Sequence, residues 1–255
     1  MIYRCFMTED FNQATHLISK ANRIFLLTGA GISAESGIPT FRDKQTGLWE
    51  NYRAEDLANI NAFKKDPQTV WSWYQWRRGL VQDKQPNPAH YALANLQQWA
   101  TDNHKDCSLI TQNVDDLHEQ AGSQAIHLHG HLWKNKCSQC DASFSDAIDY
   151  NDLQLLSCPM CGGHIRPDIV WFGEMLPQGA WQYAEEAAVH CDVFISIGTS
   201  SLVYPAAGLA QLAKQTGAKV IEINLNPTQS PLVDVVLAGQ AGEILPRILA
   251  ALEDK

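Results

Sequence analysis

The sequence lacks any long apolar run. No stretch reaches the roughly 18 consecutive apolar residues that a membrane-spanning helix requires. It also lacks an excess of positive charge, because 19 Lys and Arg residues face 28 Asp and Glu residues, which gives a formal net charge of −9. An acidic chain is a poor general binder of nucleic acid or of anionic lipid surfaces. We therefore expect neither a nucleic-acid partner nor a membrane partner.

The N-terminal segment lacks the features of a targeting sequence. It has neither the apolar core of a secretory signal nor the Arg-rich pattern of a transit peptide. Cysteine is present but does not suggest a disulfide framework, because the count of seven is odd. Four of the cysteines form two Cys-x-x-Cys pairs, whereas Cys5, Cys107 and Cys191 are scattered. This usage is typical of a metal site in a reducing compartment, so we expect a cytoplasmic protein.

The rest of the composition is that of a globular protein. The chain has 255 residues, 45% hydrophobic and 18% charged, which favours one large domain with a smaller insert. Short, continuous apolar runs are separated by helical patterns, as is typical of buried parallel strands. These features predict an α/β fold, a Rossmann-like doubly wound parallel sheet. The expected strands are 23–28, 108–111, 193–197, 219–223 and 233–237, and the expected helices are 10–21, 88–100, 178–189, 205–216 and 242–253.

Two segments do not fit this scaffold. Residues 44–85 are rich in Trp and show no strand pattern, and residues 131–166 hold the paired cysteines. We expect them to pack together as a smaller module made of a helical segment and a zinc ribbon. The Rossmann-like nucleotide-binding domain would then consist of residues 1–43, 86–130 and 167–255.

A Gly-rich segment, Gly29-Ala-Gly-Ile-Ser-Ala-Glu-Ser-Gly37, follows the first expected strand directly. Glycine at positions 29 and 31 would let the backbone approach a diphosphate closely, although a simple tight turn would have the same sequence. An ordinary dehydrogenase is disfavoured, because no second strand ending in an acidic residue appears about 20 residues further on. A nucleotide would therefore be held differently here.

The paired cysteines predict a structural zinc ion. Cys137 and Cys140 form one pair, Cys158 and Cys161 the other, and 17 residues separate the pairs. Each pair can form a knuckle, and two knuckles supply a closed tetrahedral set of four thiolates. Because no coordination position stays open, this zinc would not activate water.

Two further segments carry polar groups that suit catalysis. Thr111-Gln-Asn-Val-Asp115 follows an apolar run, so it should lie at the carboxyl end of a strand, where α/β sheets bind ligands. His127-Leu-His-Gly-His131 places three histidines at the boundary between the two expected modules. The near-neutral pKa of histidine suits His129 to general-base catalysis. A structural role is favoured for His127 and His131, whose functions the sequence leaves open.

Taken together, these motifs resemble those of the sirtuin family, over roughly residues 20–250. The resemblance implies NAD-dependent removal of acyl groups from protein lysines, with NAD consumed and nicotinamide, O-acyl-ADP-ribose and free lysine formed. It implies acyl-lysine proteins or peptides as partners, and a monomer is favoured. The motifs that carry it are Gly29–Asp43, Gln112–Asp115, His129-Gly130, the paired cysteines, Val170–Glu174, Gly198–Ser200 and Asn224–Asn226.

The resemblance also assigns residues. It implies that His129 is the general base acting on the ribose hydroxyls and that Asn113 shares the catalytic pocket. It implies that the segment Val170, Trp171, Phe172 and Gly173 pairs strand to strand with the substrate peptide. The implied NAD-binding residues are Gly29, Ala30, Gly31, Ile38, Phe41, Arg42, Gln112, Asn113, Asp115, Gly198, Thr199, Ser200, Asn224, Asn226 and Ala241.

A Tyr-x-x-Arg pattern at Tyr74 and Arg77 bears on the acyl group. Positions i and i+3 lie on one face of a helix, and within sirtuins this pair resembles the subgroup that removes succinyl and malonyl groups. Arginine can hold a terminal carboxylate by two parallel hydrogen bonds, and tyrosine adds a third. If Arg77 is instead exposed on a solvated helix, we expect a deacetylase without preference for acidic acyl groups. A mono-ADP-ribosyltransferase and a zinc-ribbon module that only senses NAD are two more candidate functions.

Overall fold

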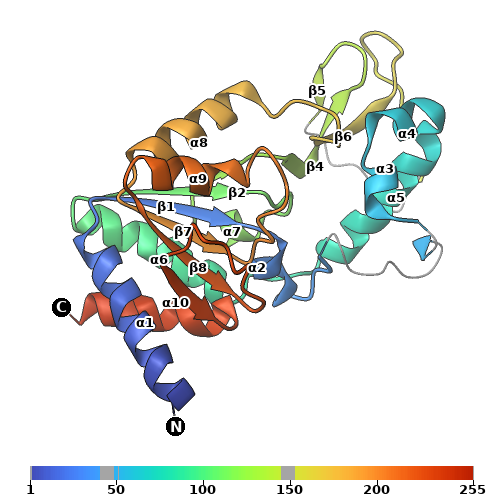
Figure 1. Ribbon diagram of the computed structural model, residues 1–255. Coiled ribbons are helices and arrows are strands. Elements are labelled where there is room, and N and C mark those ends of the chain that lie inside the picture. Colours follow the sequence, from blue (N-terminus) through green and yellow to red (C-terminus); the bar gives the residue numbers. More distant parts are fainter. Residues whose placement is uncertain (1, 41–48, 51, 145–152, 255) are drawn as a thin grey trace.

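The computed structural model describes residues 2–40, 49–50, 52–144 and 153–254. Its main element is a six-stranded sheet in the order β3-β2-β1-β7-β8-β9, with every pair of neighbours parallel (Figure 1). The order reverses next to β1, so this sheet has the switch point of a doubly wound fold, and the predicted fold class is confirmed. The strands are β1 (Arg23–Thr28), β2 (Asp106–Thr111), β3 (Ala125–His127), β7 (Val193–Ile197), β8 (Lys219–Asn224) and β9 (Val235–Ala238).

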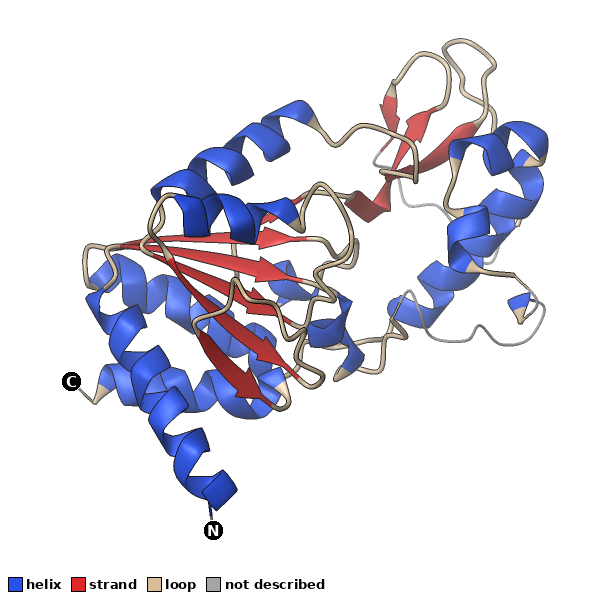
Figure 2. Cartoon of the chain, viewed as in Figure 1, coloured by secondary structure: helices blue, strands red, loops and turns tan. Residues whose placement is uncertain are grey.

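Helices cover both faces of this sheet (Figure 2). On one face, α1 (Ile2–Lys20), α6 (Pro88–Asp102) and α10 (Ala241–Glu253) enclose a core that includes Ile18, Leu93 and Ile248. On the other face, α8 (Gln178–His190) and α9 (Gly208–Gln215) enclose Phe25, Phe194 and Leu209. Two covered faces explain why the central strands are continuous apolar runs.

The predicted elements differ most from the structure in two places. The first helix begins at Ile2, well before the expected start at residue 10. Strand β3 has no counterpart among the predicted strands, because three residues are too few to show a period, and this strand exists through its pairing with β2. Among the described residues, no strand lies between β1 and β2.

A second sheet stands away from the parallel one and holds three antiparallel strands in the order β5-β4-β6 (Figures 1 and 2). These are β4 (Gly130–Cys137), β5 (Ser143–Phe144) and β6 (Ile165–Ile169). Next to them lie α3 (Ala54–Leu57), α4 (Ile60–Lys65) and α5 (Pro67–Val81). The short helix α7 (Leu117–Gln120) connects β2 to β3 of the parallel sheet.

Buried contacts join α5 to the second sheet. Trp71 is fully buried against Cys137, Cys158 and Ile165. Arg78, which no sequence pattern marks as special, is also fully buried. Its Nε donates to the carbonyl oxygen of Leu132 at 2.8 Å. A buried guanidinium requires such partners, and this one links α5 to β4.

Within the described part of the chain, none of the helices is both long enough and apolar enough to cross a bilayer.

Candidate active site

The carboxyl ends of β1 and β7 are joined through two glycine-containing turns. Gly29 N donates to the Ile197 carbonyl at 3.0 Å, and Gly31 N donates to the Gly198 carbonyl at 2.8 Å. A Cβ at Gly31 would lie 2.6 Å from the Gly198 oxygen, so no larger residue fits there. The sequence predicts that glycines 29 and 31 make room for a diphosphate. The structure gives a further reason, which is that they let one turn of the protein's own backbone pack on the other.

The end of β2 connects these two turns. Asn113 is buried, and its Nδ2 donates to the Gly29 carbonyl at 3.2 Å and to Ser33 Oγ at 3.0 Å. Gln112 Nε2 donates to Thr199 Oγ1 at 3.2 Å. Three strand ends that are far apart in sequence are therefore held together by side-chain amides. Ser33 is not among the predicted site residues, because nothing in its local sequence distinguishes it from Ser36.

The remaining predicted nucleotide residues also lie at the carboxyl ends of the parallel strands or just after them. Asn224 ends β8, and its Nδ2 donates to the Thr199 carbonyl at 2.9 Å, while Asn226 N donates back to Asn224 Oδ1 at 3.2 Å. Ser200 is exposed on the Thr199 turn, and Ala241 is buried as the first residue of α10. A row of backbone and amide groups at one sheet edge is the arrangement with which α/β folds bind dinucleotides.

The Gly-rich segment continues into the helical insert. Ala30 is half-buried in the short helix α2 (Ala30–Ala34), and Ile38 is buried in the apolar cluster of the insert, which also holds Tyr74 and Trp171. Phe41 and Arg42 lie outside the described residues.

His129 lies between β3 and β4, where the two sheets meet. Its Nδ1 is 2.9 Å from the Gln112 carbonyl oxygen. A carbonyl can only accept, so Nδ1 carries the hydrogen, and in the neutral ring Nε2 keeps its lone pair. Burial lowers the pKa of His129 below its usual value, although the Gln112 bond acts in the opposite direction. The imidazole of His129 is therefore neutral at physiological pH.

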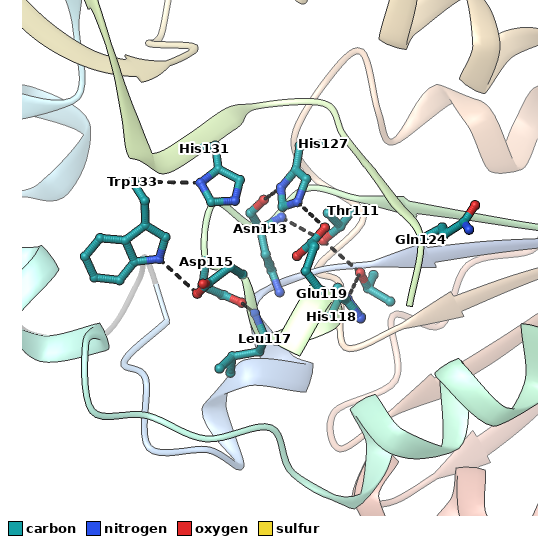
Figure 3. A network of polar contacts seen from close by, with 12 residues as sticks. Thr111, Asn113, Asp115, Leu117, His118, Glu119, Gln124, His127, His131 and Trp133 are labelled. Carbon is teal, nitrogen blue, oxygen red and sulfur yellow. Dashed lines mark hydrogen bonds and ion pairs between the residues drawn. The ribbon is translucent and has the colours of Figure 1, made fainter. Parts of the chain in front are cut away.

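A polar network lies around the end of β2 and the loop into β4 (Figure 3). His127 Nδ1 contacts the Asn113 carbonyl at 2.9 Å, and its Nε2 contacts Glu119 Oε1 at 2.9 Å. Asp115 is buried and accepts from Leu117 N at 3.3 Å. Burial raises the pKa of the Asp115 carboxyl, partly offset by the hydrogen bonds it accepts. Glu119 is a member of this network that no sequence motif marks.

The predicted substrate segment is hydrogen-bonded both to the loop between β3 and β4 and to the helical insert. Val170 N donates to the His129 carbonyl, and Phe172 N donates to the Ala58 carbonyl, each at 2.9 Å. Trp171 N donates to Glu174 Oε2 at 2.9 Å, and its buried side chain faces the insert. These three N–H groups are used internally, and so is the Trp171 carbonyl, which accepts from Glu174 N at 2.9 Å, so strand pairing with a peptide would have to use the other backbone groups of the segment.

Arg166, which is not among the predicted site residues, contacts both Trp171 of this segment and Glu174 just after it. Its Nη2 donates to Glu174 Oε2 at 2.8 Å, and its guanidinium carbon lies 3.3 Å from the centre of the Trp171 ring. Burial on its own would raise the pKa of Glu174, but the hydrogen bonds from Arg166 and from Trp171 N outweigh it, so the pKa is lowered. The carboxylate is therefore charged, and it fixes the turn that follows the segment.

Tyr74 and Arg77 lie on one face of α5, as their spacing predicts. Tyr74 is buried, and its hydroxyl accepts from Trp171 Nε1 at 2.8 Å, which leaves the hydroxyl hydrogen to donate. Burial raises the pKa of Tyr74, so the phenol is neutral. Arg77 is half-buried, with its guanidinium carbon 5.2 Å from the centre of the Trp73 ring. Burial lowers its pKa, while Tyr74 and Asp115 raise it.

The four paired cysteines come together at the end of β4. Sγ of Cys137 and Sγ of Cys161 are 3.4 Å apart, and those of Cys140 and Cys158 are 3.8 Å apart. A tetrahedral zinc ion with Zn–S bonds of about 2.3 Å needs sulfur atoms about 3.8 Å apart. The four sulfur atoms therefore fit one structural zinc ion and leave no position for water.

Comparisons with known proteins identify one matching family and several similar sequences. The pattern of the Sir2 family matches residues 29–205. An NAD-dependent protein deacylase of Ralstonia nicotianae is 49% identical over 244 residues, which cover 93% of this chain and 95% of that protein. NAD-dependent protein deacylase 2 of Pyrobaculum aerophilum is 46% identical over 235 residues, covering 91% and 92%.

Solved structures give the same result. A crystal structure of a Sir2 homologue with NAD has a TM-score of 0.87 and 44% identity, covering 95% of this chain and 94% of that one. The structure of Sir2Af2 bound to a myristoylated histone peptide has a TM-score of 0.77 and 35% identity, covering 97% and 98%.

Proposed function

The chain belongs to the Sir2 family and is an NAD-dependent protein deacylase, and we propose that it removes succinyl or malonyl groups as well as acetyl groups from lysine side chains. The single observation that carries the catalytic part of this proposal is the placement of His129. Its Nδ1–H is fixed on the Gln112 carbonyl, and the neighbouring Asn113 side chain contacts the Gly29 turn. This placement would hold a base next to the expected NAD site.

The residues of this pocket fit NAD. Buried or half-buried amides at Asn113, Gln112 and Asn224 converge on one edge of the sheet, next to glycine turns that permit close backbone approach. When bound, NAD supplies the ribose carbon that releases nicotinamide and the ADP-ribose that accepts the acyl group. We propose that Nε2 of His129 takes the proton of a ribose hydroxyl in this reaction. Asp115, whose buried carboxyl accepts from Leu117 N, would accept a hydrogen bond from the same sugar.

The protein substrate would approach His129 from the side opposite the proposed NAD site. The segment from Val170 to Gly173 is bonded to the His129 carbonyl, so a peptide aligned along it lies next to the base. We propose that this segment pairs with the backbone of an acyl-lysine peptide, which makes selectivity for peptide sequence weak. The insert and the zinc ribbon, residues 44–85 and 131–166, would form one wall of the cleft, and the protein would act as a monomer.

Arg77 is the residue that would select acidic acyl groups. Its guanidinium lies on the same face of α5 as the Tyr74 hydroxyl, so both can donate to one carboxylate. We expect Arg77→Met to reduce kcat/KM for a succinyl-lysine peptide roughly ten- to a hundredfold more than for an acetyl-lysine peptide, because a charge-assisted pair contributes about 1.5–3 kcal/mol. The measurement is deacylation of matched peptides. Arg53→Met is the control, since Arg53 is exposed and pairs only locally with Asp56 among the described residues. Equal losses on both peptides would leave a deacetylase without acidic-acyl preference.

The pH dependence follows from the state of His129. A base must be neutral, and burial lowers the pKa of His129 below about 6.5. We therefore expect kcat/KM for an acetyl-lysine peptide to stay constant from neutral pH down to about pH 6.5 and to fall below that value, as the ring becomes protonated. A profile that falls with a midpoint above about pH 7 would contradict this assignment. An acetyl substrate is used because it does not titrate in this range.

Product analysis separates the three candidate functions. A deacylase gives free lysine and O-acyl-ADP-ribose, whereas a mono-ADP-ribosyltransferase attaches ADP-ribose to protein. A module that only senses NAD would release no nicotinamide in the presence of an acyl peptide. Mass spectrometry of the nucleotide products and of the peptide after reaction with NAD distinguishes all three outcomes.

A further inference from the structure

A second group of metal-ligating side chains lies beside the nucleotide pocket, apart from the four cysteines (Figure 3). Glu119 comes from α7, His127 from β3 and His131 from β4. One ligand atom of each lies within 4.8 Å of the other two. The two imidazole rings have their centres 5.0 Å apart and are tilted by 55°. The sequence places the two histidines near each other but not Glu119, which the turn of α7 brings to them.

His127 is oriented as metal-binding histidines commonly are. Such a histidine usually donates its second ring N–H to a carbonyl or carboxylate oxygen, which fixes the tautomer. Here Nδ1 lies 2.9 Å from the Asn113 carbonyl oxygen and must donate to it. Nε2 therefore points to Glu119 Oε1, 2.9 Å away. Without an ion, this contact needs a proton between two atoms that can both accept, and a divalent cation can replace that proton.

His131 completes the group from the other side. Its Nδ1 accepts from Trp133 N at 3.3 Å, which is a long hydrogen bond. Within the residues that the structure describes, no hydrogen bond to its Nε2 is found. Coordination through Nε2 would place the ring hydrogen on Nδ1 and so give up only this long contact. The Glu119 side chain is 39% exposed, so an ion can reach the group from solvent.

We propose that Glu119, His127 and His131 form a binding site for a divalent transition-metal ion of the zinc type. Two imidazole nitrogens and one carboxylate oxygen are the ligands of zinc sites that keep a fourth position open. With bonds of about 2.0–2.1 Å, tetrahedral ligand atoms lie about 3.4 Å apart. The ligand atoms now lie within 4.8 Å of one another, so binding needs a movement of roughly an ångström, which side-chain rotation supplies.

The site is coupled to the nucleotide pocket through Asn113. The carbonyl of this residue holds His127, and its side-chain amide contacts the Gly29 turn and Ser33. An ion bound by His127 would therefore fix the residue that connects the glycine turn to β2. This makes the site a place where metal concentration can act on the pocket, separate from the structural zinc.

The test uses protein that already holds one equivalent of structural zinc. Co²⁺ is added, and binding is followed by calorimetry and by visible absorption, because cobalt on nitrogen and oxygen ligands gives weak d–d bands without the intense charge-transfer bands of thiolate ligands. We expect the wild type to bind one equivalent with nitrogen and oxygen ligands. Glu119→Gln and His131→Gln should each weaken binding at least about tenfold. His16→Gln, which removes an exposed histidine of α1, should bind like the wild type.

Neither Glu119→Gln nor His131→Gln replaces a member of the Asn113–His127 contact. An unchanged thermal midpoint shows that each of these two variants is folded. Absence of cobalt binding to the wild type would overturn the proposal. So would binding that persists in both variants, or spectra with thiolate bands, which would show exchange into the four-cysteine site.

Discussion

Replacing His129 by asparagine is expected to reduce the rate of lysine deacylation by about 10²–10⁴-fold, the usual contribution of a general base. Asparagine can still donate a hydrogen bond toward the Gln112 carbonyl, which the Nδ1–H of His129 now reaches at 2.9 Å. It has no group that can take a proton near neutral pH. The substitution therefore removes the base while keeping the local structure, and the loss should appear in kcat more than in NAD binding.

The measurement is formation of deacylated peptide and of nicotinamide under NAD saturation. His16→Asn is the matched control, because it makes the same substitution at an exposed position on α1 and should retain full activity. NAD binding by calorimetry shows whether the pocket of the variant is intact. Deacylation within a few-fold of the wild-type rate would rule out His129 as the base, whereas an inactive wild type with acyl peptides would contradict the deacylase function itself.

Loss of the zinc ion is expected to unfold the second sheet. Cys137 is buried at the end of β4, against Trp71, and β4 pairs with β6 through residues next to it. Structural zinc contributes about 10–16 kcal/mol to the folding of small zinc modules, so even a fraction of this amount is large for one lobe. We expect Cys137→Ala to bind no structural zinc and to lower the thermal midpoint by at least about 10 °C, since 1 kcal/mol shifts it by about 2–4 °C at this size.

The same variant should also lose deacylase activity. His129 and Gly130 lead directly into β4, and the His129 carbonyl accepts from Val170 N just after β6. Disorder in this sheet would release both the base and the substrate segment. Cys107→Ala is the control, because Cys107 is a half-buried cysteine of β2 outside the cluster. Zinc content by mass spectrometry is the readout, and a Cys137→Ala protein with full zinc and an unchanged midpoint would contradict the assignment.

Much of the site can be predicted because it rests on short segments of chain. The Gly29–Gly37 turn, the Cys137 and Cys140 pair and the run Gln112–Asp115 each follow from local chemistry, namely backbone freedom, knuckle spacing and position at a strand end. The order of these segments along the chain is sufficient to indicate the family. The Tyr74 and Arg77 pair is predictable for the same reason, because helical spacing alone places both on one face.

Other features depend on residues that are distant in sequence. Arg78 is buried and donates to the Leu132 carbonyl, whereas its neighbour Arg77 is half-buried, and no local sequence pattern distinguishes the two. The contact of Tyr74 with Trp171 spans 97 positions, and that of Asn113 with Gly29 spans 84. Such pairings are decided by how the sheets and helices pack, and packing depends on the whole chain.

The types and spacing of the glycines and cysteines, and the position of His129 among them, are properties of short backbone segments, so they are visible in the sequence. The folded chain sets which side chains meet. It set Gly31 against Gly198, chose the tautomer of His129 through the Gln112 carbonyl, and brought Glu119 to His127 and His131. The physical reason is that a hydrogen bond or a metal ligand set acts over about 3 Å, and only folding brings distant residues that close.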